Sequence, residues 1–332
     1  MIKPANRYEN SLSRSMAVAI ILFFIATFIP STAQAKVYID ITSPSTRKFP
    51  IAIEDFENGS SYNEITDVIR ADLDFSGLFN IVGGKGEEGN DSFWQSAGAE
   101  ALIKGKVTSK DNLLIIEAYL YDIVKGTTLL AKRYRGEKRG LRNISHYFAN
   151  DVLEVLTGER GIFETRIAFV AKRGRNKEIY LMDYDGENSR QVTANESINL
   201  SPSWSPDGRE LIYTSFMEGV ASIYRKKLAT FKDTKLLNKK YMNMGGAWSP
   251  DGKKIALTIS KDGDSDLFLI EKGGSSLKRL TSGWGLDVSP AWSPDGKTIV
   301  FVSDRSGNPN LYATSASGSN LRRLTFEGKY NA

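Results

Sequence analysis

An exact internal repeat in the second half of the chain constrains its fold more than any other feature. The pentapeptide Trp-Ser-Pro-Asp-Gly begins at Trp204, at Trp248 and at Trp292, so 44 residues separate each copy from the next. A short apolar run follows each copy, and a matching run over residues 167–170 lies 44 residues upstream of the first. Four short strands in a unit of about 40–45 residues are typical of a β-propeller blade. The repeat therefore predicts a β-propeller over residues 166–332.

The pentapeptide has the residues of a tight turn. Proline presets φ for the second position of a turn, the aspartate side chain bonds nearby backbone, and glycine accepts a positive φ. We expect the tryptophan to fill space between blades, and stacking of Trp204, Trp248 or Trp292 against a ligand is the alternative.

The chain contains fewer repeats than a typical closed propeller has blades. About 3.8 units of 44 residues fit between residue 167 and residue 332, whereas closed propellers usually have about 4–8 blades. We expect an incomplete propeller, and a four-bladed ring is the alternative.

Residues 36–165 follow a different pattern, which predicts a small α/β domain. Alternating or β-branched runs predict strands, and apolar residues at helical spacing predict helices. The predicted strands cover residues 36–42, 49–56, 79–82, 101–107, 113–121 and 127–134, and the predicted helices cover residues 63–75 and 142–156. Gly158 is expected to cap the second helix.

The first 35 residues have the features of a secretory signal peptide. Lys3, Arg7 and Arg14 precede an uncharged apolar run over residues 16–29, and Ala33-Gln34-Ala35 forms an A-x-A cleavage site. The alternative is an uncleaved membrane anchor, but 14 apolar residues are short of the roughly 20 that span a bilayer. We therefore expect cleavage after Ala35 and export to the periplasm.

Composition excludes several kinds of chemistry. The chain has no cysteine and one histidine, His146, which excludes a disulfide scaffold, a thiolate zinc site and a cysteine nucleophile. No G-x-S-x-G nucleophile motif occurs. The net charge of +5 is too mild to indicate nucleic-acid binding. We therefore expect no catalytic residue, cofactor or metal, and we expect His146 on a helix surface or half-buried.

Three further segments favour structural roles over ligand binding. The glycine-rich residues 83–90 lack the phosphate-loop pattern. Asp262, Asp264 and Asp266 begin like a calcium loop but lack its glutamate, so a solvated hairpin is favoured over a cation site. Six basic residues are expected to form a solvated strand edge rather than an anionic partner site: Lys132, Arg133, Arg135, Lys138, Arg139 and Arg142.

The chain as a whole resembles the TolB family of periplasmic Tol-Pal system components. The resemblance rests on the signal peptide, the strand that follows it, the segment Ala-Asp-Leu-Asp-Phe-Ser-Gly-Leu-Phe at 71–79, and the blades with Ser-Asp-Arg-Ser-Gly-Asn-Pro at 303–309. It implies a six-bladed propeller, of which two blades are missing here.

The resemblance also implies a non-enzymatic linking role. Such proteins connect TolA of the inner membrane to the lipoprotein Pal, maintain outer-membrane integrity, support envelope constriction at cell division, and are exploited by bacteriocins for import. Membrane contact is expected only through partners.

The resemblance assigns two binding segments. TolA is expected to capture the mature N-terminal strand, which consists of Lys36, Val37, Tyr38, Ile39, Asp40, Ile41 and Thr42. Pal is expected to dock on a propeller rim of loops before the Trp-Ser-Pro-Asp-Gly turns, which includes Met242, Asn243, Met244, Gly245, Asp287 and Val288. Met242 departs from the histidine typical of better-known members. The hairpin that contains Asn308 is expected on the opposite side of the blades.

Two other functions remain as alternatives from the residues. One is the propeller domain of a secreted prolyl-peptidase-like hydrolase whose catalytic domain is missing. The other is a propeller that binds a sugar or a cation.

Overall fold

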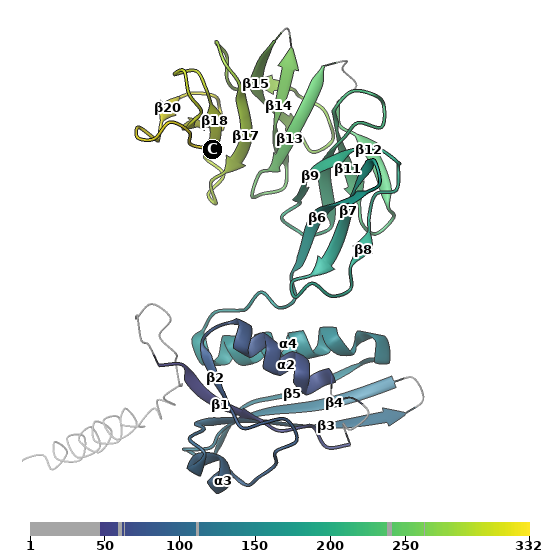
Figure 1. Cartoon of the computed structure of the whole chain (residues 1–332), viewed down its shortest axis with the longest axis vertical. Coiled ribbons are helices and arrows are strands. Elements are labelled where there is room, and N and C mark those ends of the chain that lie inside the picture. Colours follow the sequence, from purple (N-terminus) through teal and green to yellow (C-terminus); the bar gives the residue numbers. More distant parts are fainter. Residues whose placement is uncertain (1–46, 59–61, 63, 111–112, 238–240, 262) are drawn as a thin grey trace, which may run out of the picture. The chain divides into compact units, whose positions relative to one another are not determined.

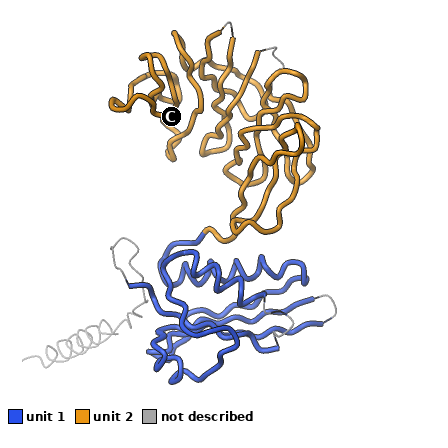
Figure 2. Tube along the Cα trace, viewed as in Figure 1, with its two compact units in different colours: residues 1–161 blue, residues 162–332 orange. Residues whose placement is uncertain are grey.

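The computed structural model describes residues 47–58, 62, 64–110, 113–237, 241–261 and 263–332. The expected signal peptide and the TolA-binding segment Lys36 to Thr42 lie outside these residues. The chain divides into two compact units, Met1–Gly161 and Ile162–Ala332 (Figure 2). Among the residues that the structure describes, no helix has both the length and the apolar character needed to cross a bilayer.

The N-terminal unit is a five-stranded sheet with two long helices on one face (Figure 1). The strand order is β2-β1-β3-β4-β5; β1 pairs in parallel with β2 and β3, and β3, β4 and β5 are antiparallel. The strands are β1 (Phe49–Ile53), β2 (Phe79–Val82), β3 (Ala101–Lys110), β4 (Leu113–Asp122) and β5 (Thr127–Glu137). The helices are α2 (Glu64–Phe75), α3 (Asp91–Ser96), the 3₁₀ turn η1 (Lys138–Gly140) and α4 (Leu141–Thr157). The predicted α/β fold is confirmed, and the short α3 was not predicted.

His146 lies deeper in this unit than the sequence suggested. Helix α4 packs against α2, and this contact buries His146 to 2% exposure. Its Nδ1 lies 2.8 Å from Oδ2 of Asp72, which is also buried. The prediction of a surface or half-buried histidine is therefore wrong, because burying a polar ring is tolerated when a charged partner faces it.

The C-terminal unit consists of four successive antiparallel sheets, which we call blades 1 to 4 (Figure 1). Blade 1 contains β6 (Arg166–Arg173), β7 (Asn176–Asp183) and β8 (Arg190–Gln191). Blade 2 contains β9 (Asn199–Trp204), β10 (Glu210–Ser215), β11 (Ser222–Lys227) and β12 (Lys232–Lys235). Blade 3 contains β13 (Met242–Trp248), β14 (Lys254–Lys261), β15 (Asp264–Glu271) and β16 (Lys278–Arg279). Blade 4 contains β17 (Asp287–Trp292), β18 (Thr298–Ser303), β19 (Asn310–Ser315) and β20 (Arg322–Arg323). The predicted propeller blades are confirmed.

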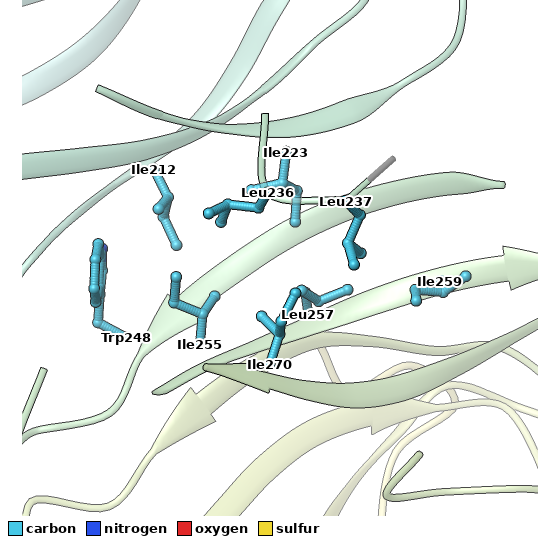
Figure 3. Close-up of a cluster of buried hydrophobic side chains, with 9 residues drawn as sticks. All are labelled: Ile212, Ile223, Leu236, Leu237, Trp248, Ile255, Leu257, Ile259 and Ile270. Atoms are coloured by element: carbon cyan, nitrogen blue, oxygen red, sulfur yellow. The ribbon is translucent and has the colours of Figure 1, made fainter. Parts of the chain in front are cut away.

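Apolar side chains hold neighbouring blades together. Figure 3 shows Ile212 and Ile223 of blade 2 packed against Trp248, Ile255 and Ile270 of blade 3. Burying an aliphatic side chain of this size contributes about 1.5–3 kcal/mol. The first strands β9, β13 and β17 also contact one another in series, so they form the innermost layer of the blades.

The repeated tryptophans belong to these blade interfaces. Trp248 is buried in the cluster between blades 2 and 3, and Trp204 packs against the cluster between blades 1 and 2. The indole Nε1 of Trp292 donates a hydrogen bond of 3.1 Å to the carbonyl of Ala247 in the preceding blade. The prediction that the tryptophans fill space between blades is confirmed.

Candidate functional site

The innermost strands β9, β13 and β17 all begin at the same end of the blades. β9 pairs antiparallel with β10 so that Asn199 lies opposite Ser215, and β17 pairs with β18 so that Asp287 lies opposite Ser303. The sequence predicts loops before the Trp-Ser-Pro-Asp-Gly turns, but residues 199–201, 243–245 and 287–289 are parts of strands. Each contains a bulge, at which Ser201, Gly245 and Ser289 adopt φ values of 52°, 58° and 55°.

The first residue of each segment, Asn199, Asn243 or Asp287, is polar and buried, and it braces the blades. Asn199 donates to the carbonyl of Lys177 and to Glu178, at 3.0 Å each. Asn243 accepts a hydrogen bond of 2.7 Å from the amide of Ile223. Asp287 receives a charged hydrogen bond of 2.6 Å from Arg305. Asn243 and Asp287, both in the predicted rim, thus hold the innermost strands in position.

The residue before each of Asn199, Asn243 and Asp287 is apolar and exposed, and the 44-residue period continues to Tyr330. Ile198, Met242, Leu286 and Tyr330 follow one another at intervals of 44 residues, with exposed fractions of 39%, 42%, 46% and 73%. We call these four residues the apolar rim. Only Met242 of this rim was predicted, although the 44-residue period applied to apolar positions would have revealed the other three.

Further exposed apolar side chains surround the apolar rim. Trp284 is 90% exposed, between Gly283 and Gly285 in the connection from β16 to β17. The Asp304 carboxylate accepts a hydrogen bond of 2.7 Å from the amide of Leu286, which fixes this connection to the β18–β19 hairpin. Met217, Val220 and Tyr241 are exposed in the neighbouring connections of blades 2 and 3. Several exposed apolar side chains at one end of the blades are typical of an interaction surface.

Three further residues of the rim predicted to bind Pal are half-buried: Met244, Gly245 and Val288. Met244 and Gly245 lie in β13 and Val288 lies in β17. A Cβ built on Gly245 meets no atom within 4 Å, and its equivalents Ser201 and Ser289 show that side chains are tolerated at this bulge.

The hairpin of Asn308 lies at the same end as the apolar rim. Because Asp287 lies opposite Ser303 at the end of β18, the β18–β19 hairpin of residues 304–309 adjoins the start of β17. The prediction that Asn308 lies on the opposite side is therefore wrong. The opposite end carries the Ser-Pro-Asp-Gly turns, which connect the last residue of each innermost strand to the next strand.

Of the three aspartates predicted to resemble a calcium loop, Asp266 forms an ion pair. Asp264 is exposed, Asp266 is ion-paired with Arg279, and Asp262 lies outside the described residues. Burial raises the pKa of Asp266, and the Asp287 carboxylate adds to this, while Arg279 opposes it. Within the described ranges, no group of three or more His, Cys, Asp or Glu side chains is arranged to hold a metal ion.

Two other candidate segments lie in the N-terminal unit. Amides of the glycine-rich loop bind carboxylates of the chain itself: Gly84 donates to Glu87 at 2.9 Å and Gly89 donates to Glu54 at 3.0 Å. The basic residues of β5 lie on an edge strand, where Lys132 pairs with Asp151 at 3.1 Å. Internal carboxylates thus occupy the amides of Gly84 and Gly89 and the ammonium group of Lys132.

Comparison with protein families follows the same division of the chain. Residues 153–332 match the model of the TolB β-propeller domain, and residues 37–129 match the TolB amino-terminal domain. The chain belongs to the TolB family. A curated TolB-family protein from Geobacter sulfurreducens, the Tol-Pal system protein TolB, is 39% identical over 214 residues, which cover 60% of this chain and 49% of the relative. The protein of that name from Bordetella pertussis is 38% identical over 235 residues, covering 68% and 54%.

A solved TolB-family structure supports the fold assignment. The crystal structure of TolB from Acinetobacter baumannii matches with a TM-score of 0.77 and 29% identity, covering 86% of this chain and 73% of that one. The chain spans about half the length of the curated TolB-family relatives it matches.

Proposed function

We propose that this protein is a non-enzymatic component of the periplasmic Tol-Pal system that links TolA to the lipoprotein Pal. In this role it maintains outer-membrane integrity and supports envelope constriction at cell division, and bacteriocins are further candidate partners. The relatives from Geobacter sulfurreducens and Bordetella pertussis are Tol-Pal system proteins, which supports the proposal. The apolar rim is the observation that carries it, because a linking protein needs an exposed surface that a second protein can cover.

Pal is proposed to dock on the apolar rim. Four exposed apolar side chains recur at the same position of consecutive repeats, and Trp284 adds a large aromatic group two residues before Leu286. Aromatic side chains at the centre of an interface often account for most of its binding energy. Met242 is the proposed contact from the sequence-predicted set. Met244, Gly245 and Val288 line the surface, and Asn243 and Asp287 support it from below.

TolA is proposed to bind the segment of Lys36 to Thr42. Its alternating apolar residues Val37, Ile39 and Ile41 suit addition as a strand to the edge of a partner sheet, where backbone hydrogen bonds provide affinity. The segment follows the expected cleavage site, so export would leave it with one free end.

A bridging assay tests the linking function. Immobilised TolA should capture the full-length protein and, through it, soluble Pal. Deletion of residues 36–42 should abolish capture of both by TolA, whereas a direct titration should still detect Pal binding. Capture by TolA that is unchanged after the deletion would contradict the proposed segment, and absence of Pal from the captured complex would contradict the linking role.

A further inference from the structure

The hairpin between β6 and β7 carries a concentrated positive charge. Residues 172–177 read Lys-Arg-Gly-Arg-Asn-Lys, and all four cationic residues are exposed. Arg173 is anchored, because its Nε donates a hydrogen bond of 2.9 Å to the Tyr180 hydroxyl and its guanidinium lies 5.3 Å from the centre of the Tyr180 ring. Within the described residues, the side chains of Lys172, Arg175 and Lys177 form no ion pair.

The equivalent hairpins show that the fold does not require this charge. The 44-residue repeat places residues 216–221, 260–265 and 304–309 at the same position in blades 2, 3 and 4. Their formal charges are −1, −1 and 0, against +4 in blade 1. Since all four hairpins connect the same two strands of a blade, the charge of the first is a property of this surface rather than of the turn.

This basic hairpin adjoins the apolar rim. The amide of Lys177 donates a hydrogen bond of 3.0 Å to the carbonyl of Ser197, and the Lys177 carbonyl accepts one of 3.0 Å from Asn199. Ile198 of the apolar rim lies between Ser197 and Asn199 in sequence. Glu196 contributes one exposed negative charge in the same connection, so the surface beside Ile198 keeps a net positive charge.

We propose that the basic hairpin selects a protein partner with acidic side chains at the edge of its apolar docking surface. The inference rests on the proposed function, since it concerns the partner that covers the apolar rim. A protein seated on Ile198 brings its own surface next to the hairpin, and clustered Asp and Glu side chains are the complement of four cations. Opposite charges at the edge of an interface accelerate encounter and discriminate against partners of the wrong charge.

Charge reversal tests the inference. The triple variant Lys172→Glu, Arg175→Glu, Lys177→Glu leaves the anchored Arg173 in place. Its association rate with soluble Pal should fall about tenfold at about 0.1 M salt, with little change in dissociation rate. The difference should shrink at about 1 M salt, because the Debye length falls from about 10 Å to about 3 Å.

The opposite end of the propeller supplies a matched control. Arg209, Lys253 and Lys297 follow the three Ser-Pro-Asp-Gly turns, are exposed, and are spaced by 44 residues. Reversing these three charges to Glu changes the net charge equally, and it should leave the association rate unchanged. Circular dichroism would verify that both triple variants fold.

The possible outcomes separate the two proposals. Pal binding by the wild type, with equal association rates for the two triple variants, would overturn the inference and leave the proposed function standing. Failure of wild-type protein to bind Pal would overturn both. Loss of binding to anionic phosphatidylglycerol vesicles by the hairpin variant, with Pal binding unchanged, would overturn the inference in favour of a membrane contact.

Discussion

At the scale of single residues, each Ser-Pro-Asp-Gly turn is closed by the same two side chains. In blade 3, the Ser249 hydroxyl donates a hydrogen bond of 2.6 Å to Asp251 and accepts one of 2.9 Å from the amide of Lys254. Asp251 also accepts from the amide of Lys253 at 3.1 Å, and Gly252 takes a φ of 67°. The turns at Ser205 and Ser293 repeat these contacts, which confirms the turn predicted from the pentapeptide.

These carboxyl groups make the folded state less stable at acid pH than at neutral pH. Hydrogen bonds from the Ser249 hydroxyl and the Lys253 amide lower the pKa of Asp251, and the pKa values of Asp207 and Asp295 are lowered in the same way. A carboxyl whose pKa is lower in the folded state stabilises that state above its unfolded pKa of about 3.9, and this stabilisation is lost as the pH falls through the folded value.

Substitution of Asp251 tests this dependence. Asp251→Asn should lower the midpoint of thermal unfolding at pH 7 by a few degrees, because the neutral amide is a weaker acceptor. As the pH falls below the lowered pKa of Asp251, the wild-type carboxyl becomes protonated, and the two proteins should melt at more nearly the same temperature. A difference in melting midpoint that stays constant from pH 7 to about pH 2 would argue against a role for the charge.

At the scale of elements, helix α4 ends as the sequence predicts. Gly158 caps it with a φ of 82°, and its amide donates to the carbonyl of Glu154 at 2.8 Å. A left-handed conformation is costly for residues with a Cβ.

Two glycines at the ends of α4 provide a matched comparison. Gly158→Ala should reduce the free energy of unfolding by about 1 kcal/mol. Gly140→Ala should not, because Gly140 has a φ of −95° and a Cβ there meets no atom within 4 Å. Urea unfolding of both variants measures the difference, and equal losses of stability would show that the left-handed cap is not responsible.

Several elements could be predicted because their signals are local. The Trp-Ser-Pro-Asp-Gly period located the blades, and helical apolar spacing located α2 and α4. The sequence predicts loops where the innermost strands lie, because Pro202 and Pro290 interrupt two of these strands and Gly245 and Gly246 lie in the third. Proline is tolerated there because β9 and β17 lie at the edges of their sheets.

Features that depend on residues far apart in the sequence were harder to predict from the sequence. His146 is buried because its partner Asp72, 74 residues away, lies on the helix packed against α4. The sequence places Asn308 at the wrong end of the blade because it predicts a loop in place of β17. With β17 counted as a strand, the β18–β19 hairpin lies at the end where β17 begins. The apolar rim depends on four residues that only the blade packing brings to one surface.

At the scale of the propeller, the repeat itself generates the proposed docking surface. Consecutive repeats place Ile198, Met242 and Leu286 at or just before the starts of β9, β13 and β17, and Tyr330 continues the 44-residue period. Buried polar residues beside the first three fix the innermost strands. The central claim is that these apolar residues act together as one surface for Pal.

Titration of Pal onto a series of apolar-rim variants tests that claim most directly. Ile198→Asp, Met242→Asp and Leu286→Asp should each weaken binding by about 2 kcal/mol or more, since each places a charge in an apolar contact. Lys253→Asp, on the exposed turn at the opposite end, is the control and should bind like the wild type. Weaker Pal binding by all three folded apolar-rim variants is the predicted result, and wild-type affinity in all three would contradict the account.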